Sequence, residues 1–155
     1  MLSTFLFASA TPSSVKVAPM DNVGPRPMEQ QTQTSVIRDY LQAWQGLGSA
    51  LEQNRADLLE RDFAGQAKET LAHTIREQQK LGIRTSYEDR AHNIKVLFYS
   101  PEGLSIQLVD DAEYEVQVHD HHGILGTQQV HTRYFAVLTP TESRWKVRIF
   151  QGSAP

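Results

Sequence analysis

The chain has 155 residues, of which 39% are hydrophobic and 21% are charged, and its formal net charge is −3 at pH 7. These values are ordinary for one globular domain with a tail. The acidic balance, without a stripe of Lys and Arg, argues against a nucleic-acid-binding surface. The chain contains no cysteine, which excludes disulfide bonds, a thiolate nucleophile and a Cys-based zinc site.

The first 34 residues are predicted to form a disordered leader or linker. Pro, Ser, Thr and Gln dominate there, and apolar residues are too sparse to offset the entropy of the chain. The apolar run at residues 2–8, followed by Ser9 and Ala10, resembles the end of a signal peptide without its basic region. Export, anchoring through a truncated N-terminal segment and a cytoplasmic location all stay open. The folded domain is predicted to span residues 35–152.

Three helices are predicted in the first half of that domain. Thr34 or Ser35 is a suitable N-cap for the first. Asn54 is expected to cap a short second helix, and a third is expected at about residues 66–81, ending at Gly82 in the left-handed conformation. The first helix has an apolar stripe at spacings of three and four, made of Ile37, Tyr40, Leu41, Trp44, Leu47 and Leu51.

From residue 85 onward the apolar residues alternate with a period of two, which predicts strands. A turn at residues 100–103 and a polar tip at residues 119–126 separate the first three strands. Residues 132–151 form a predicted hairpin. Helices followed by about four long antiparallel strands predict an α+β fold, with the helices on one face of a curved sheet. In the hairpin we expect Leu138 to pair with Trp145, Ala136 with Val147 and Tyr134 with Ile149.

Three segments carry a resemblance to a known superfamily: VIRDYLQAWQGLGSALEQN, NRADLLERDFAG and RYFAVLTPTESRWKVRIF. Over residues 35–151 the chain resembles the nuclear transport factor 2-like superfamily, the cone-shaped fold shared with ketosteroid isomerase and the SnoaL-like cyclases. The exit Leu81-Gly82-Ile83 looks closer to the non-enzymatic domains appended to membrane-associated proteins, as in plastid division factors. The superfamily contains enzymes, binding modules, carriers and dimerisation domains, so the resemblance implies a fold rather than one function.

Asp110 is the main candidate for chemistry, because it falls on the inward parity of its strand between Leu108 and Ala112. A desolvated carboxylate there would have a raised pKa and would act as a general base or a proton donor. The competing interpretation, which we favour, is a β-bulge at Asp110 and Asp111 that turns Asp110 outward. In an enzyme the catalytic residues would be Asp110, Tyr114 and Tyr40, and the pocket lining would be Tyr40, Trp44, Asp110, Tyr114 and Tyr134.

The histidines do not predict a metal site. His119 and His131 fall on the outward parity, and His121 and His122 lie at the hairpin tip without a fixed geometry. We expect His73 and His92 to be surface residues. No Ser-His-Asp order, glycine-rich phosphate loop or H-E-x-x-H motif is present, and we expect neither a metal nor another cofactor.

The outward face of the final hairpin is predicted to be apolar, with Phe135, Val137 and Phe150 on it. Apolar patches of this kind often mark partner surfaces, so we favour a homodimer or a protein partner there over cover by the linker or the C-terminal tail. The leading hypothesis is a non-catalytic binding or interaction module. The alternative is a small-molecule isomerase or cyclase, or a carrier of a small apolar ligand, that uses an inward-facing Asp110.

Overall fold

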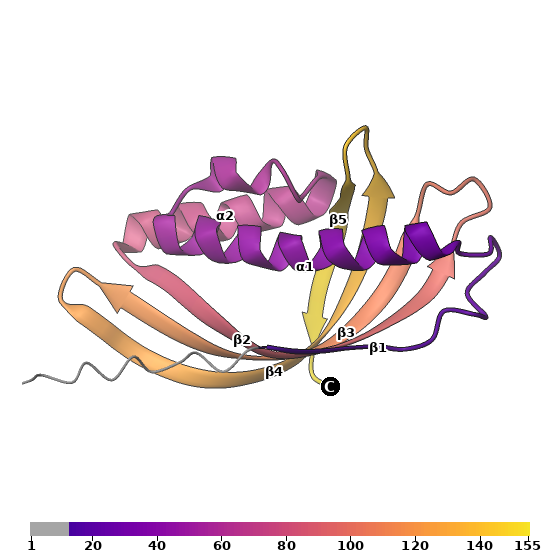
Figure 1. The fold of residues 1–155 in the computed structure, drawn as a ribbon. Coiled ribbons are helices and arrows are strands. Elements are labelled where there is room, and N and C mark those ends of the chain that lie inside the picture. The colour runs from indigo at the N-terminus through magenta and orange to yellow at the C-terminus, as the bar shows by residue number, and fades with distance from the viewer. Residues whose placement is uncertain (1–12) are drawn as a thin grey trace, which may run out of the picture.

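The structure, a computed structural model, describes residues 13–155. Two α-helices and one 3₁₀ turn lie on one face of a curved five-stranded sheet, whose strands follow one another in the order β1-β2-β3-β4-β5 (Figure 1). The elements are β1 (Ser14–Val17), α1 (Gln30–Gln53), η1 (Ala56–Leu59), α2 (Gly65–Leu81), β2 (Arg84–Tyr99), β3 (Ile106–Asp120), β4 (Gly123–Pro140) and β5 (Trp145–Ser153).

The α+β class and the four long antiparallel strands agree with the prediction. Three details differ from it. The second of the three expected helices is the single 3₁₀ turn η1, and a fifth strand, β1, pairs in parallel with β2. Asn54 is the left-handed C-cap of α1, with φ 51°, rather than the N-cap of the next helix. Gly82 ends α2 in the left-handed conformation, with φ 65°, as predicted.

The folded part of the chain begins before residue 35, which corrects the predicted boundary. Residues 14–17 pair with residues 91–94 of β2, and Met20 and Met28 are 7% and 8% exposed in the core. Few apolar residues suffice here because β1 gains backbone hydrogen bonds from the edge of an existing sheet. The helix α1 begins at Gln30, so the Thr34 hydroxyl donates to the carbonyl of Gln30 instead of capping the helix. The apolar run at residues 2–8 lies outside the described residues.

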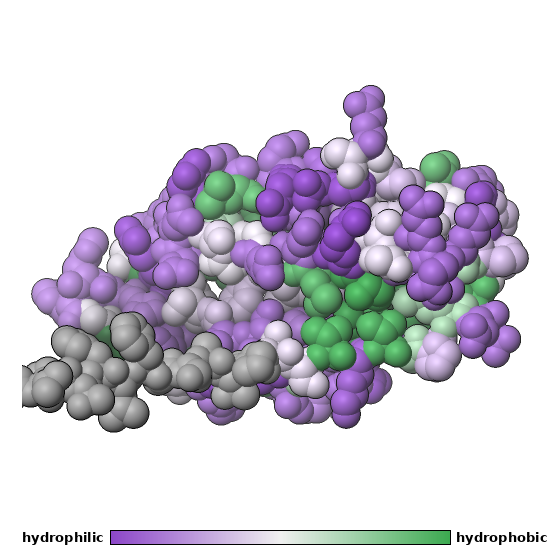
Figure 2. Space-filling view, viewed as in Figure 1, coloured by the Kyte–Doolittle hydropathy of each residue, from purple (hydrophilic) through white to green (hydrophobic). Residues whose placement is uncertain are grey.

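The core lies between α1 and the concave face of the sheet (Figure 1). In Figure 2 most of the outward surface of the helices is hydrophilic. Figure 2 also shows a hydrophobic patch between α1 and β1, where Val17, Met20, Ile37 and Leu41 line a groove. No helix within residues 13–155 is long and apolar enough to cross a membrane. The predicted stripe of α1 supplies Tyr40, Trp44 and Leu47 to the core, opposite Ile94, Leu108, Ala112, Ala136 and Leu138 of the sheet.

The final hairpin has a different register from the predicted one. Pro140, not Leu138, pairs with Trp145. The turn is tighter than expected because the backbone N–H of Thr141 donates to the carbonyl oxygen of Arg144 at 2.8 Å. The other predicted pairs shift as well, since Leu138 pairs with Val147, Ala136 with Phe150 and Tyr134 with Gly152.

A β-bulge at Arg148 then exchanges the faces of the sheet to which the side chains in the second half of β5 point. Val147 and Ile149 pair with consecutive residues of β4, which leaves Arg148 without a partner in the ladder. Val147 and Phe150 both pack on the core as a result, and Ile149 turns to the convex face. The bulge directly follows the point where the backbone of residues 62–64 hydrogen-bonds with Val147.

Candidate functional site

Asp110 points into the interior and is fully buried, with 0% of its surface exposed. The favoured expectation of a bulge at Asp110 and Asp111 is therefore wrong, because β3 pairs regularly with β4 through both residues. The sheet bends instead through the neighbouring strand β2, which has bulges at Arg90 and Leu97. We correctly expected a curved sheet, but we expected the bulge in β3 and the structure has it in β2.

The Asp110 carboxylate accepts two hydrogen bonds on one oxygen. The Tyr40 hydroxyl donates to Oδ2 at 2.7 Å, and Nδ1 of His92 lies 2.7 Å from the same oxygen. Tyr40 and His92 are 0% and 2% exposed. Tyr40 comes from α1, His92 from β2 and Asp110 from β3, so this group joins the helix to the centre of the sheet. We call Tyr40, His92 and Asp110 the buried triad.

The bulge at Arg90 places a second carboxylate, that of Asp89, beside the triad. Before the bulge Asp89 faces the interior, and after it His92 does, so two residues three positions apart lie on the same face. Nε2 of His92 is therefore 3.3 Å from Oδ2 of Asp89, and the imidazole lies between two carboxylates. We predicted His92 to be a surface residue, and this was wrong. A signal was present, because His92 shares the parity of the buried Ile94.

The two carboxylates determine the charge of His92. Burial lowers the pKa of its imidazole, but the hydrogen bond with Asp110 and the nearby carboxylate of Asp89 outweigh burial and raise the pKa to about 9. His92 is thus a cation at neutral pH. Burial, followed by the charge of Asp110, raises the pKa of the Tyr40 hydroxyl well above its ordinary value, so Tyr40 stays a hydrogen-bond donor.

Trp44 separates the triad from a second interior region. Its ring packs edge-on against His92, with 5.0 Å between ring centroids, and against Tyr134, also with 5.0 Å between centroids. The Tyr87 hydroxyl donates to the backbone carbonyl of Trp44, which holds this turn of α1 against the sheet. Trp44 therefore has the charged group on one side and a set of aromatic rings on the other.

Beyond Trp44 lies a cavity of ≈ 280 Å³ between the helices and the sheet, which we call the aromatic cavity. The hydroxyls of Tyr114 and Tyr134 are 2.6 Å apart and form a hydrogen bond at its wall. The ring of Phe150 stacks on Tyr134 with 4.5 Å between centroids. Its lining contains no acidic, basic or histidine side chain and consists of Trp44, Leu47, Leu51, Leu71, Thr74, Thr85, Tyr87, Tyr114, Val116, Tyr134 and Phe150.

The residues that we predicted to line one pocket thus fall into two groups. Trp44, Tyr114 and Tyr134 line the aromatic cavity. Tyr40 and Asp110 belong to the buried triad and do not line it. Tyr87 and Phe150 also line the cavity, although we did not predict them there. Phe150 was assigned to the convex face because the bulge at Arg148, which reverses its direction, leaves no clear mark in the alternation of residues.

The convex face of the final hairpin is consequently less apolar than predicted. Phe150 is absent from it, and Val137 is only 3% exposed. Phe135 stays partly exposed. At the other end of the sheet, β3 ends at Asp120 and β4 begins at Gly123. The polar tip between them is therefore shorter than the predicted residues 119–126. Within residues 13–155 no three His, Asp or Glu side chains are placed to hold a metal ion.

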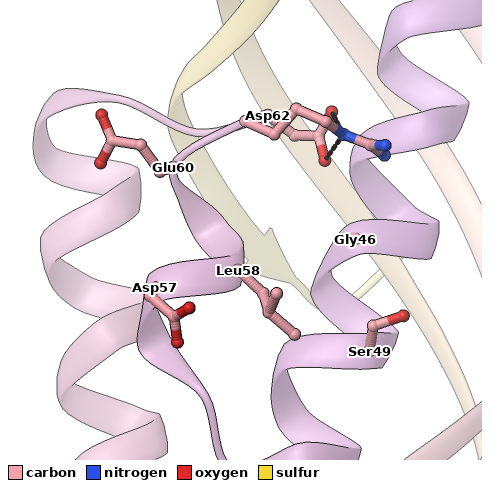
Figure 3. A pocket seen from close by; sticks show the side chains of 7 residues that line it. Gly46, Ser49, Asp57, Leu58, Glu60 and Asp62 are labelled. Carbon is pink, nitrogen blue, oxygen red and sulfur yellow. Dashed lines mark hydrogen bonds and ion pairs between the residues drawn. The ribbon is translucent and has the colours of Figure 1, made fainter.

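A second hollow, of ≈ 490 Å³, lies between α1 and η1 (Figure 3). Figure 3 shows Leu58 pointing from η1 toward the neighbouring helix α1. The buried Asp62 is 3.2 Å from Arg61, and a Cβ on Gly46 would clash with the Asp62 carboxylate. The charges here are matched within the chain, since Asp57 pairs with Arg55, Glu60 with Lys68, and Asp62 with Arg61 and Arg144. This hollow is therefore not a strong candidate for binding a charged ligand.

No family model matches the chain, and no curated protein matches it. Solved structures do match its fold. The intermembrane space region of the chloroplast protein ARC6 superposes with a TM-score of 0.65 at 15% sequence identity, covering 84% of this chain and 100% of that one. A scytalone dehydratase-like protein of Novosphingobium aromaticivorans gives a TM-score of 0.55 at 13% identity, covering 81% and 89% of the two chains.

The chain has a nuclear transport factor 2-like fold. A periplasmic fragment of TraM also matches, with a TM-score of 0.54 at 12% identity over 77% of this chain and 98% of that one. At these identities the similarity concerns the nuclear transport factor 2-like fold alone. Function has to be argued from the triad and the cavity.

Proposed function

We propose that the chain is a non-catalytic binding module that takes a small apolar molecule into the aromatic cavity. The observation that carries the proposal is the lining, which has no side chain able to exchange a proton near neutral pH. Burial first, then nearby charges and hydroxyls, raises the pKa of Tyr87 well above its ordinary value. Burial and the hydrogen bond with Tyr114 likewise raise the pKa of Tyr134.

The triad supports the same proposal by its position. Its carboxylate, imidazole and hydroxyl bond to one another and are 0–2% exposed. A substrate in the aromatic cavity would meet the ring of Trp44 rather than the carboxylate of Asp110. We therefore assign the triad to stability and the cavity to binding.

The cavity suits a ligand of one or two rings. Its volume of ≈ 280 Å³ is near the lower end of ligand sites, which are roughly 300–1,000 Å³. Aromatic rings and leucines line most of it, and the paired hydroxyls of Tyr114 and Tyr134 provide one polar position. An apolar ring with a single hydroxyl or carbonyl group matches this arrangement.

Binding is tested by titrating the whole chain with 2-naphthol and following amide and methyl resonances by NMR. We expect saturable shifts at Val116, Leu71 and their neighbours. Leu71→Trp fills the cavity and is expected to abolish the shifts, whereas Leu81→Trp, at a residue that is 70% exposed, should leave them unchanged. Shifts that do not saturate, or that survive in Leu71→Trp, would contradict the proposal.

One observation favours the enzymatic alternative. Oδ1 of Asp110 and Nε1 of Trp44 are buried without a hydrogen-bond partner among the described residues. An isomerase or cyclase would use this free carboxylate oxygen as its base, provided that Trp44 moves aside. The test is an Asp110→Asn variant, which should lose turnover of any substrate found for the chain. Full turnover in this variant would remove Asp110 as the base.

A further inference from the structure

Besides the outer edges of the terminal strands β1 and β5, the sheet leaves two stretches of its inner strands without a partner on one side among the described residues. On one side β1 pairs only with residues 91–94 of β2, so residues 84–90 have no partner strand there. On the other side β5 pairs only with residues 133–140 of β4, so residues 126–132 have a neighbour, β3, on one side alone. We call these stretches the β2 edge and the β4 edge. Each presents backbone N–H and C=O groups that another strand can pair with.

The β2 edge has the features that prevent such pairing. It carries four charged residues, and a β-bulge at Arg90 interrupts its ladder. Charges and bulges along an edge oppose the addition of a further strand. The charged residues are Arg84, Glu88, Asp89 and Arg90.

Residues 126–132 of the β4 edge have none of these features, and the one bulge of the β3–β4 ladder, at Leu125, lies just before them. Its sequence, GTQQVHT, contains no Lys, Arg, Asp, Glu or Pro. It pairs with β3 in an unbroken register, from Gly126 opposite Val118 to Thr132 opposite Ala112. The side chains of residues 126–129 are exposed. An edge that is long, regular, exposed and uncharged is the kind that accepts a strand.

We infer that the β4 edge pairs antiparallel with the β4 edge of a second copy of this chain, which joins two sheets into one. A two-fold pair places each residue opposite a residue of the same segment, so charged residues would tend to meet like charges. The uncharged composition of residues 126–132 avoids this conflict. With the two-fold axis at Gln129, Thr127 faces His131 of the second copy and Gln128 faces Val130.

The strand β5 determines this register. It ends at Ser153, opposite Arg133, and so occupies the edge of β4 from residue 133 onward. A second β4 strand that pairs with residues 126–132 places its own hairpin tip beside the end of β5. That tip carries Ile124 and Leu125, each 60% exposed. The dimer would therefore bury two of the exposed large hydrophobic side chains as well as the strand edge.

The acidic residue opposite Gln129, where the two-fold axis lies, does not oppose the pair. Glu115, on the adjacent strand β3, is 3.2 Å from Arg90 and accepts a hydrogen bond of 2.7 Å from the Gln129 amide. The charge of Glu115 is thus matched within its own chain. The inference rests on the strand edge and is independent of the proposed aromatic cavity.

The first test is sedimentation velocity on the whole chain over a range of concentrations. We expect a monomer–dimer equilibrium for the natural sequence. A Thr127→Lys, Gln129→Lys double variant should be monomeric at every concentration, because it brings like charges together at the β4 edge. The matched control changes the same two residue types on the exposed side of α2, as Gln66→Lys with Thr70→Lys, and should dimerise like the natural chain.

The second test determines the register by disulfide cross-linking. Since the chain has no cysteine, an introduced cysteine can form a disulfide only with the same cysteine of a second copy. In the inferred register the two Gln129 Cα atoms are about 5 Å apart, within the range of a disulfide. Gln129→Cys should therefore cross-link rapidly under mild oxidation. In His131→Cys the two sites lie four residues apart along the strand, on the order of 13 Å, and should not cross-link.

Three outcomes would overturn the inference. They are a monomer at all concentrations, a dimer that persists in the Thr127→Lys, Gln129→Lys variant, and cross-linking of His131→Cys in preference to Gln129→Cys. Circular dichroism of each variant verifies that the fold is retained, so that a monomer reflects the edge and not unfolding.

Discussion

The two interior regions on either side of Trp44 differ in almost every property. The buried triad contains a carboxylate, an imidazolium and a hydroxyl, and it is closed to solvent. The aromatic cavity contains no charge and has room for a ligand. The carboxylate and imidazole therefore lie outside the cavity lining, and the lining has no side chain that is charged near neutral pH. A buried carboxylate next to a histidine indicates an active site only when a cavity reaches it.

The largest expected effect is the loss of the triad carboxylate. Asp110→Ala leaves the His92 cation with only the weaker Asp89 contact and removes the acceptor of the Tyr40 hydroxyl. Removing one partner of a buried ion pair costs about 3–5 kcal/mol. Urea unfolding should show this loss in the free energy of unfolding.

Asp111 provides the matched control for that experiment. It follows Asp110 on the same strand, but its side chain is partly exposed and pairs with Arg133 at 2.8 Å. Asp111→Ala should cost less than about 1 kcal/mol, as exposed ion pairs do. Equal losses in the two variants would show that the triad contributes no more than a surface pair.

The pH dependence of stability is expected to come next in size. The folded pKa of His92, about 9, is above the unfolded value of 6.5. Protonated His92 therefore stabilises the fold fully below pH 6.5, and this contribution is lost as the pH rises through about 9. The loss is on the order of 3 kcal/mol, since one pKa unit corresponds to about 1.4 kcal/mol.

The measurement is chemical unfolding between pH 6 and pH 10 for the natural chain and for a His92→Gln variant. The difference between their free energies of unfolding should shrink with rising pH, because only the natural chain loses a proton from this position. NMR of the imidazole gives the pKa directly. An imidazole that is neutral at pH 7.5 would refute the assignment of His92 as a cation.

The smallest effect is expected in the aromatic cavity. Tyr134→Phe removes one hydroxyl of the Tyr114–Tyr134 pair and keeps the ring that stacks on Phe150. One hydrogen bond of this kind contributes about 0.5–1.5 kcal/mol to stability. Thermal unfolding should show a loss in that range without the pH dependence of the triad. A loss as large as that of Asp110→Ala would mean that the two regions are coupled through Trp44.

Local patterns predicted much of the site. The spacing of apolar residues in α1 placed Tyr40 and Trp44 on the buried stripe, and both are 3% exposed or less. Alternation in β3 placed Asp110 on the inward parity, although we favoured a bulge that would have turned it outward. For His92 the parity with Ile94 was informative, but the general tendency of a lone histidine to lie at the surface outweighed it.

The sequence by itself determined the order of the two long helices and the four long strands, the α+β class, the amphipathic stripe of α1 and the left-handed end of α2 at Gly82, because these depend on neighbours within a few positions. Only the tertiary structure decided where the sheet bends. The bulge at Arg90 joins Asp89 to His92, and the bulge at Arg148 turns Phe150 into the cavity. A curved sheet needs bends, but several strands can supply them at similar local cost, so packing against α1 and residues 62–64 makes the choice.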